Sequence, residues 1–299
     1  MKIEILNYSD KKAAQEFVGF CECRFNNKLT FVCQKIAEND SIRAITLAGP
    51  TCSGKTTAAS RITDELEKLG KKARLISIDD FYRPKSELER LGITDVEGAC
   101  AIDTDLFSSV ASDLAGFRET SIPTYDFVTK TRPYLTPYTP DDNDIYIFEG
   151  IQAVYPEILS CLTDFNSVSV FINVGEDLFV NGIAFDKNEL RLIRRIVRDY
   201  HHRNADVAYT MGLWENVRLN EENNIFPHSE SSDFKINSMI PYEVFILGQD
   251  FLMLTEGYTS DKPFYKLIVE IRNKLLSISD HCFELSMIPY NSLLREFIA

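Results

Sequence analysis

Four hydrophobic runs, each about the length of a buried strand, are separated by longer stretches with helical periodicity. The strand-like runs cover residues 42–48, 73–80, 144–150 and 167–174. Strands that alternate with helical stretches predict a parallel sheet with helices on both faces. Ligands of such sheets bind at the carboxyl ends of the strands, so the chemistry of this chain is expected there.

Helical periodicity also marks the N-terminal part of the chain. Residues 10–40 are expected to be mostly helical, with an apolar stripe that contains Phe17, Phe20, Cys21 and Phe25. A second helix is predicted to end at Leu69, with Gly70 as its C-cap.

The rest of the chain is expected to be largely helical. Residues 188–219 are polar, basic and helical in period, and further helices are predicted over 241–254 and 262–279. The last helix is expected to start at Pro263. Its predicted buried stripe consists of Leu267, Ile268, Ile271 and Leu275.

Composition narrows the classes of partner. The 299 residues include 32 basic and 45 acidic side chains, which gives a net charge of −13. Such an acidic surface argues against nucleic-acid and membrane partners, although it allows a small basic pocket for an anionic ligand. Seven cysteines without framework spacing, and an N-terminus without an apolar signal segment, favour a reduced, cytoplasmic location. The oligomeric state stays open, a homo-oligomer included.

The stretch "GPTCSGKTT", residues 49–57, has the spacing of a phosphate-binding loop between a strand and a helix. Backbone N–H groups of such a loop, together with the positive end of the following helix, bind phosphate oxygens. Lys55 is expected to reach the β- and γ-phosphates of a nucleotide, and Thr56 to ligate Mg²⁺. A chance glycine loop is the alternative, and the strand and helix around it argue against that alternative.

Acidic residues end the next two strands. Asp79 and Asp80 lie in "SIDDFYR", and Glu149 ends "IYIFE". A carboxylate there can accept the proton of an attacking hydroxyl or hold a metal ion, whereas the alternative is that these acids only cap turns or end a strand. The chain lacks the NKxD motif of GTPases and the HRD and DFG motifs of protein kinases.

These motifs, together with "IPTYDFVTKTR" and "ELRLIRRIVRDYHHR", occur in an order that resembles the uridine kinase and phosphoribulokinase family. A bacterial uridine kinase-like branch of that family is especially similar, through "ENNIFPHSESSDFKINS" and "IPYNSLLREFIA". The resemblance implies an α/β P-loop fold of the nucleoside-monophosphate-kinase type. It divides the chain into a helical N-terminal extension, 1–40, and a kinase domain, 41–299, with a lid at about 185–235 and a helical C-terminal part at about 240–299.

The resemblance also implies roles for individual residues. Asp79, Lys55 and Arg203 would be catalytic, with Asp79 as the base toward a ribose 5′-hydroxyl. The nucleotide would be bound by Gly49, Ser53, Gly54, Lys55, Thr56, Thr57, Arg195 and Arg198. Mg²⁺ would be held by Thr56, Asp79 and Glu149. The acceptor would contact Asp80, Tyr82, Arg83, Asp95, Glu97, Tyr125, Phe127, Lys130 and Arg132.

Some of these roles have alternatives. Phe127 could equally pack in the core, and one or two of the arginines at 191, 194, 195 and 198 are expected to form ion pairs instead of binding triphosphate. Lys130 stands where well-studied uridine-cytidine kinases carry a histidine, and "DVEGACAID" replaces their acidic run, so Asp95 or Glu97 is expected to take over the ribose diol.

The sequence thus predicts an ATP- and Mg²⁺-dependent kinase of a small-molecule hydroxyl, with uridine or cytidine as acceptor. One alternative keeps the kinase and changes the acceptor to another nucleoside, a sugar phosphate or a pantothenate-like alcohol. A second alternative is a nucleotide-binding sensor without turnover.

Overall fold

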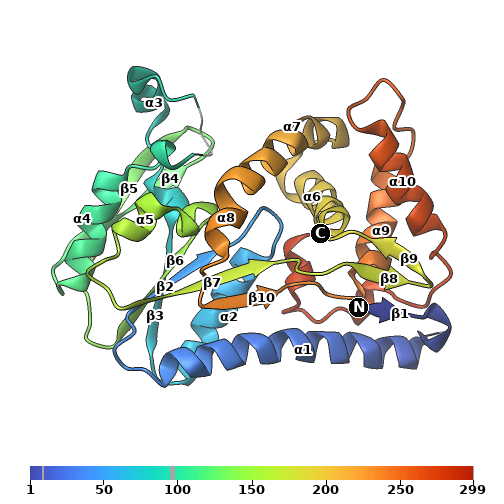
Figure 1. Cartoon of the computed structure of the whole chain (residues 1–299), viewed down its shortest axis with the longest axis horizontal. Coiled ribbons are helices and arrows are strands. Elements are labelled where there is room, and N and C mark those ends of the chain that lie inside the picture. Colours follow the sequence, from blue (N-terminus) through green and yellow to red (C-terminus); the bar gives the residue numbers. More distant parts are fainter. Residues whose placement is uncertain (9, 95–97, 299) are drawn as a thin grey trace.

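A five-stranded parallel sheet forms the centre of the molecule (Figure 1). The computed structural model describes residues 1–8, 10–94 and 98–298. The sheet contains β2 (Ala44–Ala48), β3 (Lys72–Ser77), β6 (Asp144–Glu149), β7 (Ser167–Asn173) and β10 (Phe234–Asn237), in the order β10-β7-β2-β6-β3. All four neighbouring pairs are parallel, which confirms the predicted sheet and its four strands. The fifth strand, β10, was not predicted.

The two faces of the sheet contribute to different hydrophobic cores. Ile45 and Leu47 of the fully buried strand β2 pack with α1 (Lys11–Ala37) and α2 (Lys55–Lys68). Ala44 and Ala48 face the opposite way and pack with α4 (Thr104–Ala115) and α5 (Pro156–Ser160). Because strand side chains alternate between faces, a strand that is covered on both sides is apolar throughout, as the sequence showed.

Two smaller sheets lie outside the central one. The strands β4 (Thr120–Asp126) and β5 (Thr131–Tyr138) form an antiparallel hairpin. The strands β1 (Lys2–Ile3), β8 (Leu178–Val180) and β9 (Ile183–Phe185) form a three-stranded sheet in that order. In Figure 1, α1 extends from the region of β3 to this small sheet and so runs beneath both halves of the molecule.

The remaining helices among the described residues are α3 (Lys85–Leu91), in the first half of the chain, and five helices that make up most of its C-terminal part. The five are α6 (Lys187–Arg203), α7 (Val207–Asn220), α8 (Phe226–Ser229), α9 (Glu243–Leu254) and α10 (Tyr265–Leu276). The single-turn elements are η1 (Ile5–Tyr8), η2 (Ile78–Phe81), η3 (Ala99–Ala101), η4 (Ile151–Val154), η5 (Glu221–Ile225), η6 (Leu285–Met287) and η7 (Leu293–Glu296). None of the helices in the described part of the chain is long and apolar enough to cross a membrane.

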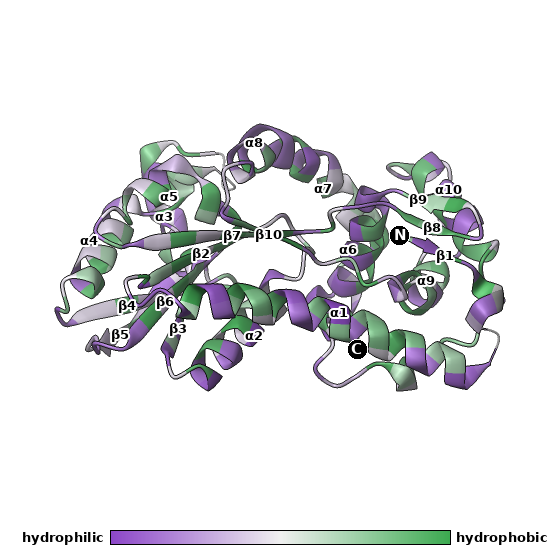
Figure 2. Ribbon diagram, turned by 60° about the horizontal axis from the view of Figure 1, so that its bottom comes forward, coloured by the Kyte–Doolittle hydropathy of each residue, from purple (hydrophilic) through white to green (hydrophobic). Residues whose placement is uncertain are grey.

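Three details of the helix predictions need correction. The expected helix over 188–219 is two helices, because Asn204 adopts a left-handed conformation with φ of 50° and Asp206 caps the next helix. Phe20 is 58% exposed and does not belong to the buried stripe of α1, since it lies well off the line through Phe17, Cys21 and Phe25. Figure 2 shows hydrophobic and hydrophilic residues alternating along α1.

The third detail concerns the last long helix. α10 begins at Tyr265 after the N-cap Phe264, and Pro263 lies before the helix instead of in its first turn. Ile268, Ile271 and Leu275 are buried as predicted, whereas Leu267 is only partly buried.

Candidate functional site

The loop between β2 and α2 depends on two glycines. Gly54, the N-cap of α2, has a φ of 86°, a conformation that glycine adopts without strain. A Cβ on Gly49 would lie 2.1 Å from the carbonyl oxygen of Ile172 on the neighbouring strand β7. The loop therefore follows its path only with glycine at both positions, which are the two that define the phosphate-loop spacing.

The polar groups of this loop suit a polyphosphate. Lys55 curls back over the loop, with its Nζ 3.4 Å from the carbonyl oxygen of Pro50. The Ser53 hydroxyl is buried and has no hydrogen-bond partner among the described residues. Thr56, in the first turn of α2, is exposed. An orphaned donor, an ammonium group and the first N–H groups of a helix fit the negative oxygens of a nucleotide.

The register of the sheet brings the predicted acids to this loop. Leu47 of β2 and Ser77 of β3 both pair with Glu149 of β6, so the three strands end side by side. Burial raises the pKa of Glu149; Lys55 opposes the rise, and the carboxylates of Asp79 and Glu296 add to it. Lys55, Asp79 and Glu149 thus lie close enough to affect one another electrostatically, as the sequence predicted.

No cluster of three or more His, Cys, Asp or Glu residues with the geometry of a metal site occurs in the described chain. A magnesium ion prefers a few protein oxygens, with water and substrate phosphates as its other ligands. The hydroxyl of Thr56 and the carboxylates of Asp79 and Glu149 are groups of that kind. Their arrangement is compatible with Mg²⁺ bound together with phosphate, and not with a closed protein cage.

Two arginines of α6 support the loop from behind. Arg191 donates to the carbonyl oxygen of Thr51, at 3.0 and 3.1 Å, and pairs with Glu221. Arg194 donates to the carbonyl oxygen of Cys52, at 3.2 Å, and pairs with Glu243. Both side chains are fully buried. Ion pairs were expected for one or two of the four arginines, but all four form them, since Arg195 and Arg198 pair with Asp199.

The other predicted arginines gather around one carboxylate. Asp199 lies 3.4 Å from Arg195, 2.7 Å from Arg198 and 3.6 Å from Arg203. Arg195 and Arg198 are buried, whereas the Arg203 side chain, at the end of α6, is 59% exposed. Asp199 can hold this group of positive charges together without a nucleotide, and the assignment of the three arginines to triphosphate stays a prediction.

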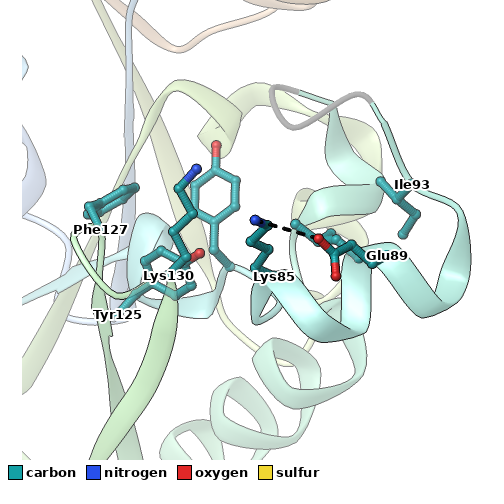
Figure 3. Close-up of a pocket in the computed structure, with 8 residues that line it drawn as sticks. Lys85, Glu89, Ile93, Tyr125, Phe127 and Lys130 are labelled. Atoms are coloured by element: carbon teal, nitrogen blue, oxygen red, sulfur yellow. Dashed lines mark ion pairs between the residues drawn. The ribbon is translucent and has the colours of Figure 1, made fainter.

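A cavity of about 430 Å³ opens beside η2 and the β4–β5 hairpin (Figure 3). Its walls are Tyr82, Lys85, Leu88, Glu89, Ile93, Tyr125, Phe127 and Lys130. The ring centroids of Tyr82, Tyr125 and Phe127 lie 4.9–6.0 Å apart. Phe127 is 60% exposed, so it belongs to the cavity and not to the core. Three residues that the sequence analysis expected at the acceptor, Tyr82, Tyr125 and Phe127, thus share one aromatic wall of the cavity.

Three further residues that were predicted to contact the acceptor do not line this cavity. Asp80 accepts the N–H of Tyr125, at 2.9 Å, and thereby ties η2 to the hairpin. Arg83 and Arg132 both pair with Glu87 and Asp103. These ion pairs offset the charges of the two arginines, and their contact with the acceptor stays a prediction. Asp95 and Glu97 lie outside the described residues.

Sequence reasoning missed two groups of residues. Lys85, Leu88 and Glu89 of α3, together with Ile93 just after that helix, line the cavity and carry no motif. Lys85 pairs with Glu89 at 3.6 Å, as the dashed line in Figure 3 shows. Glu296 binds the first turn of α2 from 239 residues further along the chain. Only the position of α3 directly after "SIDDFYR" could have pointed to the first group, and no local signal points to Glu296.

A family model described as the phosphoribulokinase / uridine kinase family matches residues 44–244. The chain belongs to this family. A uridine kinase of Staphylococcus haemolyticus is 31% identical over 176 residues, which are 58% of this chain and 76% of the relative. Uridine-cytidine kinase B of Dictyostelium discoideum is 29% identical over 192 residues, 63% of this chain and 72% of the relative.

Among solved structures, a D-glycerate 3-kinase of Cryptococcus neoformans covers 77% of this chain and 96% of its own, at 15% identity and a TM-score of 0.42. Family membership confirms the predicted α/β P-loop fold and makes the protein a phosphotransferase. Enzymes of this family in general use ATP and Mg²⁺ and act on small molecules.

The buried pair of Arg194 and Glu243 yields a test of loop support. We expect Glu243→Ala to lower the free energy of unfolding by about 3–5 kcal/mol, because it leaves a guanidinium buried without a counter-charge. Urea unfolding measures the change. The matched control is Glu222→Ala, which removes an exposed partner of Arg218, at 3.1 Å, and is expected to cost about 0–1 kcal/mol. Equal losses in the two variants would contradict the assigned role.

A second prediction concerns Asp80 and pH. Burial raises the pKa of the Asp80 carboxyl, and the N–H of Tyr125 opposes the rise. Because the folded state then binds the proton more tightly than the unfolded chain, the contribution of Asp80 to stability is greatest in acid. It decreases as pH rises from the ordinary aspartate pKa through the raised folded pKa.

Asp80→Asn keeps an oxygen for Tyr125 and removes this titration. We therefore expect the stability of the parent relative to Asp80→Asn to fall as pH rises above the ordinary aspartate pKa of about 3.9. Urea unfolding at several pH values measures the difference, and a slope of the opposite sign would show that the carboxylate is stabilised in its charged form.

Proposed function

We propose that the protein transfers the γ-phosphoryl group of ATP to the 5′-hydroxyl of a pyrimidine ribonucleoside, uridine first and cytidine second. The choice of acceptor rests on the aromatic cavity. Its lining includes Tyr82, three residues after Asp79. Aromatic faces suit a flat heterocycle, and the size of the cavity suits a single small ligand. The uridine kinase relatives at about 30% identity support the same acceptor.

The residues at the sheet edge divide the chemistry of phosphoryl transfer among them. Asp79 accepts the proton of the attacking hydroxyl, as a positioned general base does. Lys55 would lie against the charge that develops on the transferring phosphate. The Thr56 hydroxyl and the carboxylates of Glu149 and Asp79 would hold the metal. When bound, MgATP supplies the transferable group and the metal neutralises phosphate charge.

Arginines complete the site. Arg195 and Arg198 of α6 add positive charge for the triphosphate. Both arginines also contact Asp199, so the triphosphate and this carboxylate would share them. Arg203, exposed at the end of the same helix, screens the reacting group from water as part of the lid. Gly49, Gly54, Ser53 and Thr57 supply the backbone path and donors of the loop.

A second candidate acceptor is a phosphorylated sugar. Lys85 and Lys130 both line the cavity, and a phosphate group would suit two ammonium groups. Lys85 is already paired with Glu89, however, and neither cation comes with an arginine fork of the kind that binds phosphate bidentately. The aromatic wall would have no role for such an acceptor, so the nucleoside is preferred.

Release of ADP with a panel of nucleosides and phosphorylated sugars, at fixed MgATP, tests the acceptor. We expect uridine or cytidine to stimulate ADP release, because a nucleoside can use the aromatic wall and the Asp79 carboxylate together and the relatives are uridine kinases. Lys55→Ala, which lacks the cation on the transferring phosphate, serves as the blank. Turnover of ribulose 5-phosphate or pantothenate without turnover of any nucleoside would reject the proposed acceptor.

The adjacent acids provide a matched pair that separates a kinase from a nucleotide sensor. Asp79→Asn is expected to lose about 10²–10⁴ in kcat while it still binds MgATP, because the general base is removed without loss of volume. Asp80→Asn keeps an acceptor for the N–H of Tyr125, and its kcat should stay within a few-fold of the parent. Steady-state kinetics with the best acceptor measure both variants. The opposite ranking would move the base to Asp80, and no change in either would favour the sensor.

A further inference from the structure

The last eleven described residues, 288–298, pack against the phosphate loop. Leu293, Leu294 and Phe297 are fully buried, and Figure 1 shows the C-terminal end in the middle of the molecule, beside α6. Ser292 donates to the buried carboxylate of Glu22 at 2.5 Å, and Ile298 contributes its carbonyl oxygen to His202 at 3.1 Å. The segment is therefore fixed at both of its ends.

Glu296 of this segment binds the first turn of α2. Its carboxylate accepts the backbone N–H of Thr57 at 3.3 Å and the Thr57 hydroxyl at 2.9 Å. Thr57 is the third residue of α2, so its N–H has no partner within the helix. Donors at this end of a phosphate-loop helix are the ones that receive phosphate oxygens, and a carboxylate is an anion of similar size. Glu296 therefore occupies donors that a nucleotide needs.

Contacts on either side of Glu296 hold it against the loop. A Cβ on Gly54 would lie 2.4 Å from Cδ1 of Leu293, so this leucine rests directly on the loop backbone. The ring of Phe297 lies 5.1 Å from the guanidinium of Arg194, the side chain that binds the carbonyl of Cys52. The segment thus contacts the loop, the helix that follows it and the arginine behind it.

Charge makes Glu296 and a bound phosphate incompatible. The Glu296 carboxylate already lies at the first turn of α2, where it accepts the N–H and the hydroxyl of Thr57. A polyphosphate would add several negative charges at the same place, and like charges at such distances repel. The two donors of Thr57 also cannot serve both anions fully.

We propose that Glu296 is an autoinhibitory anion, which competes with a nucleotide phosphate for the N–H and hydroxyl of Thr57 and must be displaced when the nucleotide binds. This inference rests on the nucleotide-binding role of the loop and is independent of the acceptor. The C-terminal segment would then set the affinity of the enzyme for nucleotide, and any partner that withdraws it would activate the enzyme.

Calorimetric binding of MgADP to the full-length protein tests the proposal. Glu296→Gln keeps the size of the side chain and loses its charge, and Glu296→Ala loses the competing acceptor altogether. We expect the Kd for MgADP to fall about 2- to 10-fold, the factor that corresponds to the net contribution of one ordinary hydrogen bond. Glu296→Ala should bind at least as tightly as Glu296→Gln, because it loses the competing acceptor altogether. Inorganic pyrophosphate should show the same trend, whereas adenosine, which has no phosphate, should bind equally to all forms.

The matched control is Glu256→Gln, which removes the same charge from an exposed turn after α9 and should leave the Kd for MgADP unchanged. Unfolding midpoints close to that of the parent establish that the Glu296 variants are folded. Unchanged or weaker MgADP binding by folded Glu296→Ala would overturn the proposal, as would an equal gain for adenosine. If neither parent nor variants bind MgADP, the competition and the phosphate loop are both refuted. If MgADP binds but no nucleoside is turned over, only the proposed acceptor fails.

Discussion

The structure depends on how the backbone of the phosphate loop is satisfied. A loop that points its N–H groups inward toward phosphate must point carbonyl groups outward, and buried carbonyls need donors. Arg191 and Arg194 supply those donors to Thr51 and Cys52. A buried guanidinium in turn needs a counter-charge, and Glu221 and Glu243 provide it. The loop is therefore connected to α6 through its carbonyl groups, and α6 to more distant parts of the fold through its ion pairs.

These ion pairs connect the helices of the C-terminal half to the phosphate loop. Glu243 is the first residue of α9, and Glu221 begins the short element that follows α7. Both helices are thereby tied to the loop through α6. The N-terminal helix α1 joins the same core through Glu22, which accepts hydrogen bonds from Tyr242 and Ser292. The extension 1–40 therefore packs with the catalytic half instead of forming a separate unit.

The part of the fold that could be predicted from sequence is the part that local patterns determine. Strands buried on both faces are continuous apolar runs, and β2, β3, β6 and β7 were found for that reason. The edge strand β10, "FKIN", has four residues and an exposed lysine, so it lacks that pattern. The hairpin strands β4 and β5 contain Pro123, Pro133 and Pro137, which argue against strands in a sequence, and β5 is mostly exposed.

The site likewise contains residues that local patterns could place and residues that they could not. Lys55, Asp79 and Glu149 could be placed together, because parallel strands bring their carboxyl ends to one edge. The partners of Arg83 and Arg132 could not, because Asp103 and Glu87 come from α4 and α3, whose positions no motif specifies. Long-range ion pairs of this kind depend on the packing of whole elements, and a sequence shows only that the charges exist.

The C-terminal segment provides an acceptor for donors at the start of α2, on the other side of the loop. Arginines of α6 donate to the outward carbonyl groups of Thr51 and Cys52, whereas the hydroxyl of Ser53 has no hydrogen-bond partner among the described residues. An unpaired donor in a partly buried site costs free energy, and an acidic side chain from the same chain removes that cost at Thr57. The ligand-free form is stabilised by an anion that resembles the ligand's phosphate. Nucleotide must then bind by exchange of one anion for another, so the stability of the empty site and the affinity for nucleotide change in opposite directions when Glu296 is altered.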